Sequence, residues 1–387
     1  MSTYARKDIT FTKGEGIWLW DQNGGKYLDA LSGIAVCGLG HAHPKIAEVI
    51  SQQANTLLHT SNIYRISAQE QLGKQLCDVS KMQRAFFCNS GAEANEAAIK
   101  LARLHGNKQN IETPTIIVCE NSFHGRTMAT LTATGNRKAH AGFEPLVAGF
   151  IRAPFGDSET IAEICKNNSN VCAIFVEPIQ GEGGIHIPSD TFLKELRDIC
   201  DQHNLLLMLD EVQTGNGRTG KWFACHHQNI LPDVMTTAKG LGNGMPIGAC
   251  LARGDAAELF GPGSHGSTFG GNPLACATAL QVLNIIEEEN LLSHAANMGT
   301  LLVDTLKQTL SDHKLVKDIR GCGMMIGIEL TVPCVAIVDL ALKKKLLVNV
   351  TADNVIRILP PLICSKDDIA MIATLIAECI DAFQQQL

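Results

Sequence analysis

The sequence predicts an α/β protein whose central domain is built on a mostly parallel β-sheet. The first observation is a series of short apolar segments, typical of strands that are buried on both faces. The second is that amphipathic helical patterns separate several of these segments, as βαβ units require. The third is that 45% of the 387 residues are hydrophobic, which is too much apolar material for a disordered chain. The length favours two domains, or one large α/β domain with a smaller companion.

The alternating pattern runs through the middle of the chain, from roughly residue 60 to residue 270. The strands expected there cover residues 84–88, 115–119, 171–176, 205–209, 234–236 and 247–251. Helices are expected over residues 92–104 and 191–203. Because buried strands separated by helices form crossover units, this region should fold around one sheet.

The two ends of the chain follow a different pattern. Residues 16–28 predict a hairpin that turns at Asn23-Gly24-Gly25, with a helix after it. A helix over residues 275–289 is followed by another long helix, and then by strands near residues 324–330 and 355–359. We therefore expect residues 61–289 to form the large domain, and residues 1–60 and 290–387 to form a smaller α+β domain together.

Composition excludes several classes of function. The formal net charge is -7 and aromatic residues make up only 5% of the chain, so no nucleic-acid surface is expected. No apolar run approaches the length of a membrane span, and the first residues lack the apolar core of a signal peptide. The 14 cysteines never form C-x-x-C, so we expect no metal site but reduced, buried thiols in a cytoplasmic protein.

An acidic pair, Asp210-Glu211, follows the apolar run at residues 205–209, where ligands bind in open α/β sheets. One interpretation is a carboxylate that caps the next turn. A second is the magnesium-binding strand of a nucleotide hydrolase, since residues 215–221 match most of a phosphate loop. Trp222, however, replaces the Ser or Thr that such a loop needs. A third is an anionic partner for the protonated ring nitrogen of a cofactor.

The third interpretation needs a lysine elsewhere in the chain. Lys239 lies between Ala238 and Gly240, and such small neighbours would let a planar group approach the backbone. A desolvated lysine loses pKa and becomes a usable Schiff-base amine. The alternative is an ordinary loop lysine.

A phosphate site is expected where the segment 87–96 passes from strand to helix through Ser90, Gly91 and Ala92. Free N–H groups and the helix dipole at that start would hold an anion. The alternative is a simple N-cap, which contributes about 1 kcal/mol of stability.

Further polar residues follow other strands. In the segment 121–126, Phe123 could lie against a cofactor ring and Arg126 could bind a carboxylate, whereas His124 is more typical of a structural histidine. The segment 177–184 brings two carboxylates to the same sheet edge, and the segment 263–268 offers hydroxyls and amides suited to a phosphate.

In this order, the motifs resemble those of class III pyridoxal-phosphate aminotransferases, and within them the acetylornithine aminotransferase group. The matching segments are residues 90–95, 123–126, 177–184, 210–213, 236–239, 265–268 and 270–273. The resemblance extends from about residue 14 to about residue 361. It implies the type I aminotransferase fold, pyridoxal 5'-phosphate as cofactor, and a homodimer with active sites at the subunit interface.

The resemblance also implies roles for individual residues. Lys239 would bind the cofactor covalently and move the proton during transfer, and Asp210 would pair with the ring nitrogen. The implied cofactor-binding set is Ser90, Gly91, Ala92, Phe123, Asp210, Gln213, Lys239 and Thr268, with Thr268 supplied by the other subunit.

For the substrates, Arg126 would bind a carboxylate remote from the reacting carbon, Arg357 the α-carboxylate of glutamate, and Ser267 would contact substrate. Glu182 would pair with Arg357 while an ω-amine is bound. The implied reaction converts N2-acetyl-L-ornithine and 2-oxoglutarate into N-acetyl-L-glutamate 5-semialdehyde and glutamate by a ping-pong route in arginine biosynthesis. Succinyldiaminopimelate, succinylornithine, ornithine and 4-aminobutyrate remain alternative donors.

Overall fold

The computed structural model describes residues 1–387 and contains three β-sheets. The strands of the largest sheet are β4 (Arg84–Cys88), β5 (Thr115–Cys119), β6 (Phe150–Ala153), β7 (Val171–Val176), β8 (Leu206–Asp210), β9 (Val234–Thr237) and β10 (Gly248–Ala252). They follow the order β4-β10-β9-β8-β7-β5-β6. All neighbours are parallel except β10, which is antiparallel to both β4 and β9. The predicted mostly parallel central sheet is confirmed.

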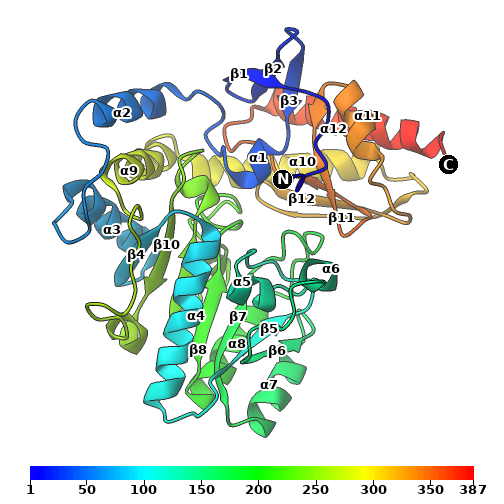
Figure 1. The fold of residues 1–387 in the computed structure, drawn as a ribbon. Helices are drawn as coiled ribbons and strands as arrows, with labels where there is room; N and C mark the ends of the chain where they lie inside the picture. The colour runs from blue at the N-terminus through cyan, green and yellow to red at the C-terminus, as the bar shows by residue number, and fades with distance from the viewer.

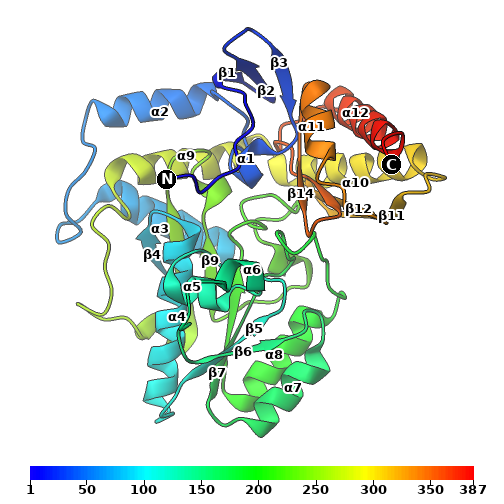
Figure 2. The ribbon, with the colours of Figure 1, turned by 45° about the vertical axis from the view of Figure 1, so that its right-hand side comes forward.

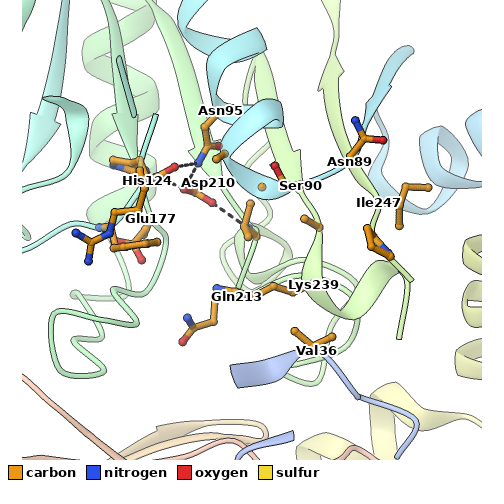
Figure 3. Close-up of a pocket in the computed structure, with 18 of the residues that line it drawn as sticks. Val36, Asn89, Ser90, Asn95, His124, Glu177, Asp210, Gln213, Lys239 and Ile247 are labelled. Carbon is orange, nitrogen blue, oxygen red and sulfur yellow. Dashed lines mark hydrogen bonds and ion pairs between the residues drawn. The ribbon is translucent and has the colours of Figure 1, made fainter. Parts of the chain in front are cut away.

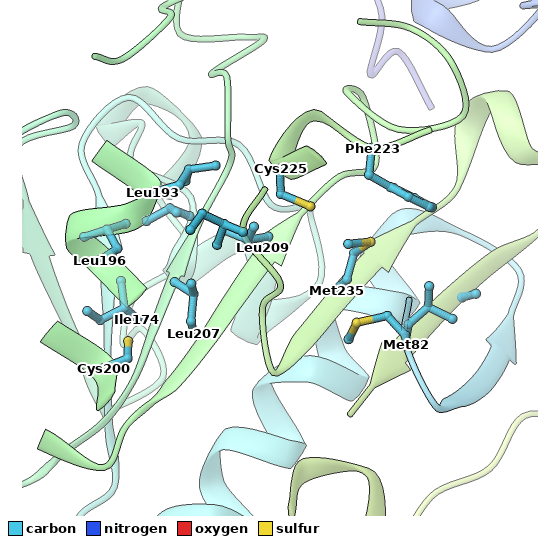
Figure 4. Packing of buried hydrophobic residues seen from close by; sticks show 14 of the residues in the cluster. Met82, Ile174, Leu193, Leu196, Cys200, Leu207, Leu209, Phe223, Cys225 and Met235 are labelled. Carbon is cyan, nitrogen blue, oxygen red and sulfur yellow. The ribbon is translucent and has the colours of Figure 1, made fainter. Parts of the chain in front are cut away.

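Helices cover both faces of this sheet, as Figure 1 shows. One face packs against α4 (Gly91–Lys108). The other face packs against α3 (Ser67–Ser80), α7 (Ser158–Asn167), α8 (Phe192–His203) and α9 (Pro273–Glu288). In Figure 4, Leu193 and Leu196 of α8 meet Leu207 and Leu209 of β8. Burying each such leucine stabilises the fold by about 1.5–3 kcal/mol, so this core holds the carboxyl ends of the strands in place.

The remaining strands come from both ends of the chain. One sheet contains β1 (Phe11–Glu15), β2 (Trp18–Asp21), β3 (Lys26–Asp29) and β13 (Leu346–Leu347). The other contains β11 (Val316–Cys322), β12 (Met325–Leu330), β15 (Val355–Ile358) and β14 (Asn349–Thr351), in that order. Figure 2 shows the first strands beside α10 (Leu291–Thr309), α11 (Ile337–Lys343) and α12 (Lys366–Gln384). Ile17 and Leu28 share one core with Ile326 and Ile376. The domain boundaries at residues 60 and 289 stay predictions.

Short elements connect these layers. They are α1 (Ser32–Ala35), α2 (Pro44–Ala54), α5 (Met128–Ala133), α6 (Arg137–His140) and the 3-10 turns Ala224–His227, Lys239–Leu241 and Gly254–Glu258. In α1, Ser32, Ile34 and Ala35 have φ angles of 47°, 66° and 61°, a left-handed conformation that is costly for residues other than glycine. Asp29 holds the turn, because its Oδ1 accepts the N–H groups of Leu31 and Ser32.

None of the helices is both long and apolar enough to cross a membrane. All cysteines are free, and most are buried among apolar side chains. Burial raises the pKa of the Cys119 thiol to about 12, so this group stays protonated at neutral pH. These thiols therefore behave as small hydrophobic side chains.

Candidate active site

A cavity of about 390 Å³ lies at the carboxyl ends of β8 and β9, beside the start of α4 (Figure 3). The residues predicted from the sequence that line it are Ser90, Gly91, Ala92, Phe123, Arg126, Asp210, Gln213 and Lys239. Glu182 and Arg357 do not line it, but Arg357 contacts both Glu182 and Gln213, and Gln213 is a lining residue. Ser267 and Thr268 lie outside it, and Thr268 is exposed.

Asp210 is the last residue of β8, and its side chain is only 4% exposed. Its Oδ2 accepts a hydrogen bond from Asn95 Nδ2 at 2.8 Å and lies 2.8 Å from His124 Nδ1, and its Oδ1 accepts the Val212 N–H at 3.0 Å. The His124 ring stacks on Phe175, with centroids 4.4 Å apart. These contacts fix one oriented carboxylate at the base of the cavity.

Asn95 is a site residue that sequence reasoning missed. It lies on the face of α4 that is otherwise lined by small apolar residues such as Ala94 and Ala98. Besides Asp210, it donates to the His124 carbonyl at 2.7 Å and accepts from Thr236 Oγ1 at 2.6 Å. A side-chain amide on the buried face of a helix needs hydrogen-bond partners. The position of Asn95 on that face is therefore the sequence signal that could have identified it.

Glu177 follows β7 and is buried close to Asp210. Its two carboxylate oxygens accept the N–H groups of Phe123 at 3.0 Å and Gly181 at 3.2 Å. Burial raises the pKa of this carboxyl to about 7, against a smaller lowering from nearby His124. Glu177 therefore ties the segment that carries Phe123 to the loop that follows β7.

The second acidic residue, Glu211, has a structural role. Its carboxylate accepts the N–H groups of Ala224 and Cys225, each at 2.9 Å, so it caps the turn that begins there. The segment 215–221 leads into this 3-10 turn rather than into an α-helix. A phosphate loop needs a helix at that point, so the nucleotide-hydrolase interpretation has no structural support.

Lys239 begins a 3-10 turn two residues after the last residue of β9, with a φ of 41°. Such a conformation is costly for lysine and persists only where the surroundings impose it. Asn216 does so, because its side chain donates to Thr237 Oγ1 at 2.8 Å and to the Ala238 carbonyl at 3.2 Å. Burial of the amine lowers its pKa, which favours the neutral, nucleophilic form.

The start of α4 presents free backbone N–H groups to the cavity. Ser90 caps the helix by accepting the Glu93 N–H at 3.2 Å, while the first amides of the helix, at Gly91 and Ala92, have no intrahelical acceptors. A Cβ atom at Gly91 would lie 2.6 Å from Val212, so only glycine fits there. Because both residues line the cavity, their N–H groups are available to an anion.

Arg357, on β15, lies on the opposite side and is fully buried. Its Nη1 donates to Glu182 Oε1 at 2.5 Å and to Gln213 Oε1 at 3.3 Å, and its Nε donates to Asn349 Oδ1 at 3.1 Å. Its Nη2 has no partner. Arg126 is exposed at the edge of the cavity, with its guanidinium 5.5 Å from the ring centroid of Phe123. Arg126 can therefore bind a carboxylate at the edge of the cavity, while Arg357 lies behind Gln213 on the opposite side.

Comparison with known proteins agrees with this geometry. The family model of aminotransferase class-III matches residues 2–380. The chain belongs to the class-III aminotransferase family. It is 57% identical to an acetylornithine aminotransferase of Nitrosomonas europaea, over 99% of this chain and 98% of that protein. An acetylornithine aminotransferase of Methanothermobacter thermautotrophicus is 47% identical over 95% of this chain and 93% of its own.

Solved structures of other aminotransferases share the fold of this class-III enzyme. The ornithine aminotransferase of Toxoplasma gondii superimposes with a TM-score of 0.96 at 32% identity, covering 100% of this chain and 93% of that one. The acetylornithine aminotransferase of Elizabethkingia anophelis gives 0.88 at 33% identity, covering 99% and 96%. The predicted type I aminotransferase fold is confirmed.

Class-III aminotransferases depend on pyridoxal 5'-phosphate, and a Toxoplasma gondii ornithine aminotransferase structure contains it at the active site. The cavity of this chain fits that group. It joins a buried carboxylate (Asp210), a desolvated lysine (Lys239) and the free amides of Gly91 and Ala92 around one space. These groups match the ring nitrogen, the aldehyde and the phosphate of the cofactor.

Proposed function

We propose that this class-III aminotransferase moves the terminal amino group of N2-acetyl-L-ornithine to 2-oxoglutarate. The products are N-acetyl-L-glutamate 5-semialdehyde and glutamate, and the reaction belongs to arginine biosynthesis. The main support is the 57% identity to an acetylornithine aminotransferase over 99% of the chain. The contact between Glu182 and Arg357 adds support, because it gives one site two charge states for two different substrates.

The cofactor supplies an electron sink for the substrate carbanion and carries the amino group between the two substrates of a ping-pong reaction. Lys239 binds it covalently and then moves the proton at the reacting carbon as base and acid. Asp210 keeps the ring nitrogen protonated, and its three contacts hold it in that orientation. The remaining proposed cofactor ligands are Ser90, Gly91, Ala92, Phe123 and Gln213, with Thr268 from a second subunit.

The two substrates require different charges in one cavity. In acetylornithine, the carbon that carries the reacting amine bears no charged group once the amine has reacted. In glutamate, the corresponding carbon bears the α-carboxylate. Glu182 neutralises Arg357 for the first and releases it for the second, when the unpartnered Nη2 of Arg357 can donate to the carboxylate. Arg126 binds the remote carboxylate of either substrate, and Ser267 contacts substrate.

We also propose that the enzyme is a cytoplasmic homodimer with active sites at the subunit interface. Support comes from exposed apolar side chains at Leu57, Leu58, Ile63, Tyr64 and Phe269, since large apolar residues at a surface favour association. The last of these lies beside Thr268, a residue outside the cavity of its own chain.

A screen of amino donors tests the proposed function. Each donor is mixed with the purified enzyme, and the visible absorbance of the cofactor is followed through a single half-reaction. We expect acetylornithine to react with a higher kcat/KM than succinylornithine, succinyldiaminopimelate, ornithine or 4-aminobutyrate. The Lys239→Ala variant should lose the absorbance band and all turnover. A preference for another donor would replace the substrate, and a protein that cannot bind the cofactor would overturn the whole proposal.

A further inference from the structure

A row of four residues crosses the C-terminal sheet next to the loop that carries Glu182. The strand register pairs Arg320 of β11 with Gly327 of β12, Gly327 with Arg357 of β15, and Arg357 with Asn349 of β14. Residues opposite one another on neighbouring strands direct their side chains to the same face of a sheet. Arg320 and Arg357 therefore face the same side, with a glycine between them.

The loop between β7 and α8 folds back on itself near this row. Gln180 and His186 exchange backbone hydrogen bonds of 3.0 Å and 3.1 Å, and the Ile185 N–H donates to the Gly181 carbonyl at 3.3 Å. Gln180 Nε2 also donates to the Glu120 carbonyl at 2.7 Å, which fixes the start of the loop to the large sheet. Glu182 lies within this closed turn, so its position depends on how the turn is held.

Arg320 holds the other end of the turn. Its Nη2 donates to the Gly184 carbonyl at 2.7 Å and its Nε to the Ile185 carbonyl at 2.8 Å. Its Nη1 donates to Asp318 at 2.7 Å and to Glu329 at 2.8 Å, which orients the guanidinium. Two bonds from one planar group fix both the distance and the direction of the backbone they bind.

The backbone that Arg320 binds is strained. Ile185 has a φ of 53°, which is unusual for a β-branched residue and persists only where contacts impose it. Its side chain is fully buried, and a Cβ atom at Gly327 would lie 2.9 Å from the Ile185 Cβ. Because Gly327 has no side chain, Ile185 can occupy the space beside it in this row.

We infer that Arg320 is a positioning residue for substrate exchange, a role that rests on the proposed function. It binds the Gly184 and Ile185 carbonyls so that Glu182, two residues earlier, reaches Arg357 in the same row. The acetylornithine half-reaction needs that contact, because Arg357 must be neutralised. The glutamate half-reaction needs Arg357 free, and therefore does not depend on Arg320.

The Arg320→Lys variant tests this role in the cofactor-loaded enzyme. Lysine keeps the charge but cannot bind two carbonyls with one planar group. We expect kcat/KM for the acetylornithine half-reaction to fall roughly tenfold, while that for the glutamate half-reaction stays within about twofold. Amide hydrogen exchange of residues 181–186 should become faster, which gives a readout independent of activity.

Two further variants keep the test decisive. Gly327→Ala would push Ile185 outward without removing any charge, and should shift the ratio of the half-reactions in the same direction. Arg197→Lys is the matched control, since Arg197 is 17% exposed against 16% for Arg320 and also binds two carboxylates. It should leave the ratio unchanged. Equal losses in both half-reactions, or no change in either, would overturn the inference. A wild-type enzyme that does not react with acetylornithine would instead overturn the proposed function.

Discussion

The two walls of the cavity differ in how firmly they hold their charges. On the wall built by β8 and α4, Asp210 is 4% exposed and has three contacts. On the opposite wall, formed by β15 and the loop between β7 and α8, Glu182 is 35% exposed, and Arg357 is the only hydrogen-bond partner of its side chain. A fixed wall suits chemistry that both substrates share, whereas a wall with one breakable ion pair suits the recognition that must change between them. Substitutions should therefore separate the walls by which half-reaction they affect.

The largest effect should follow a change on the fixed wall. In Asp210→Asn, a neutral amide replaces the carboxylate, so the charge that would keep a ring nitrogen protonated is lost. We expect both half-reactions to slow by about a hundredfold or more, in equal proportion. Single-turnover absorbance measurements with acetylornithine and with glutamate would check this. A loss confined to one substrate would show that this wall also discriminates.

A smaller and selective effect should follow a change on the wall that holds the Glu182–Arg357 ion pair, which we call the adjustable wall. Glu182→Ala leaves the buried Arg357 without its anion, so an uncharged substrate end meets an unpaired guanidinium. We expect the acetylornithine half-reaction to slow roughly tenfold and the glutamate half-reaction to remain intact. The control is Glu378→Ala, which removes an exposed ion pair with Lys344 far along the chain. Equal damage to both half-reactions would remove the proposed distinction between the walls.

The fixed wall could be predicted largely from local sequence. Asp210, Lys239 and the turn at Gly91 each lie in a motif whose residues are neighbours in the chain. The strand itself was expected over residues 205–209 but covers Leu206–Asp210, so Asp210 belongs to it. Asn95 could not be predicted in the same way, because its partner Asp210 is 115 residues away and only the packing of α4 on the sheet brings them together.

The adjustable wall depends more on long-range contacts. The pairing of Glu182 with Arg357 was expected from the family resemblance and from the opposite charges, but the row that contains Arg320 exists only once the register of β11, β12 and β15 is known. Backbone conformations were also beyond sequence reasoning. Ile34 and Ile185 adopt positive φ angles that their residue type disfavours, because tertiary contacts override local preference.

Glu177 connects the two walls, and its titration should be visible in the stability of the protein. Its carboxylate accepts the N–H of Phe123 on the fixed side and that of Gly181 at the start of the adjustable loop. Burial raises its pKa to about 7, whereas an unfolded glutamate titrates near ~4.3. The protonated form is thus favoured on folding. The resulting stabilisation is complete below a pH of ~4.3 and is lost as the pH rises through about 7.

In Glu177→Gln this dependence should disappear, because the side chain stays neutral at every pH. From pH 5 to pH 8, the free energy of unfolding of the variant should rise relative to wild type by up to about 3 kcal/mol. Urea unfolding at both pH values would measure it, with the exposed Glu258→Gln as a control that shifts equally at each pH. A constant difference between the variant and wild type would mean that Glu177 is ionised in the folded protein throughout this range. Glu177 would then connect the two walls as an ionised carboxylate throughout this range. The free energy needed to open the loop between β7 and α8 would not depend on pH.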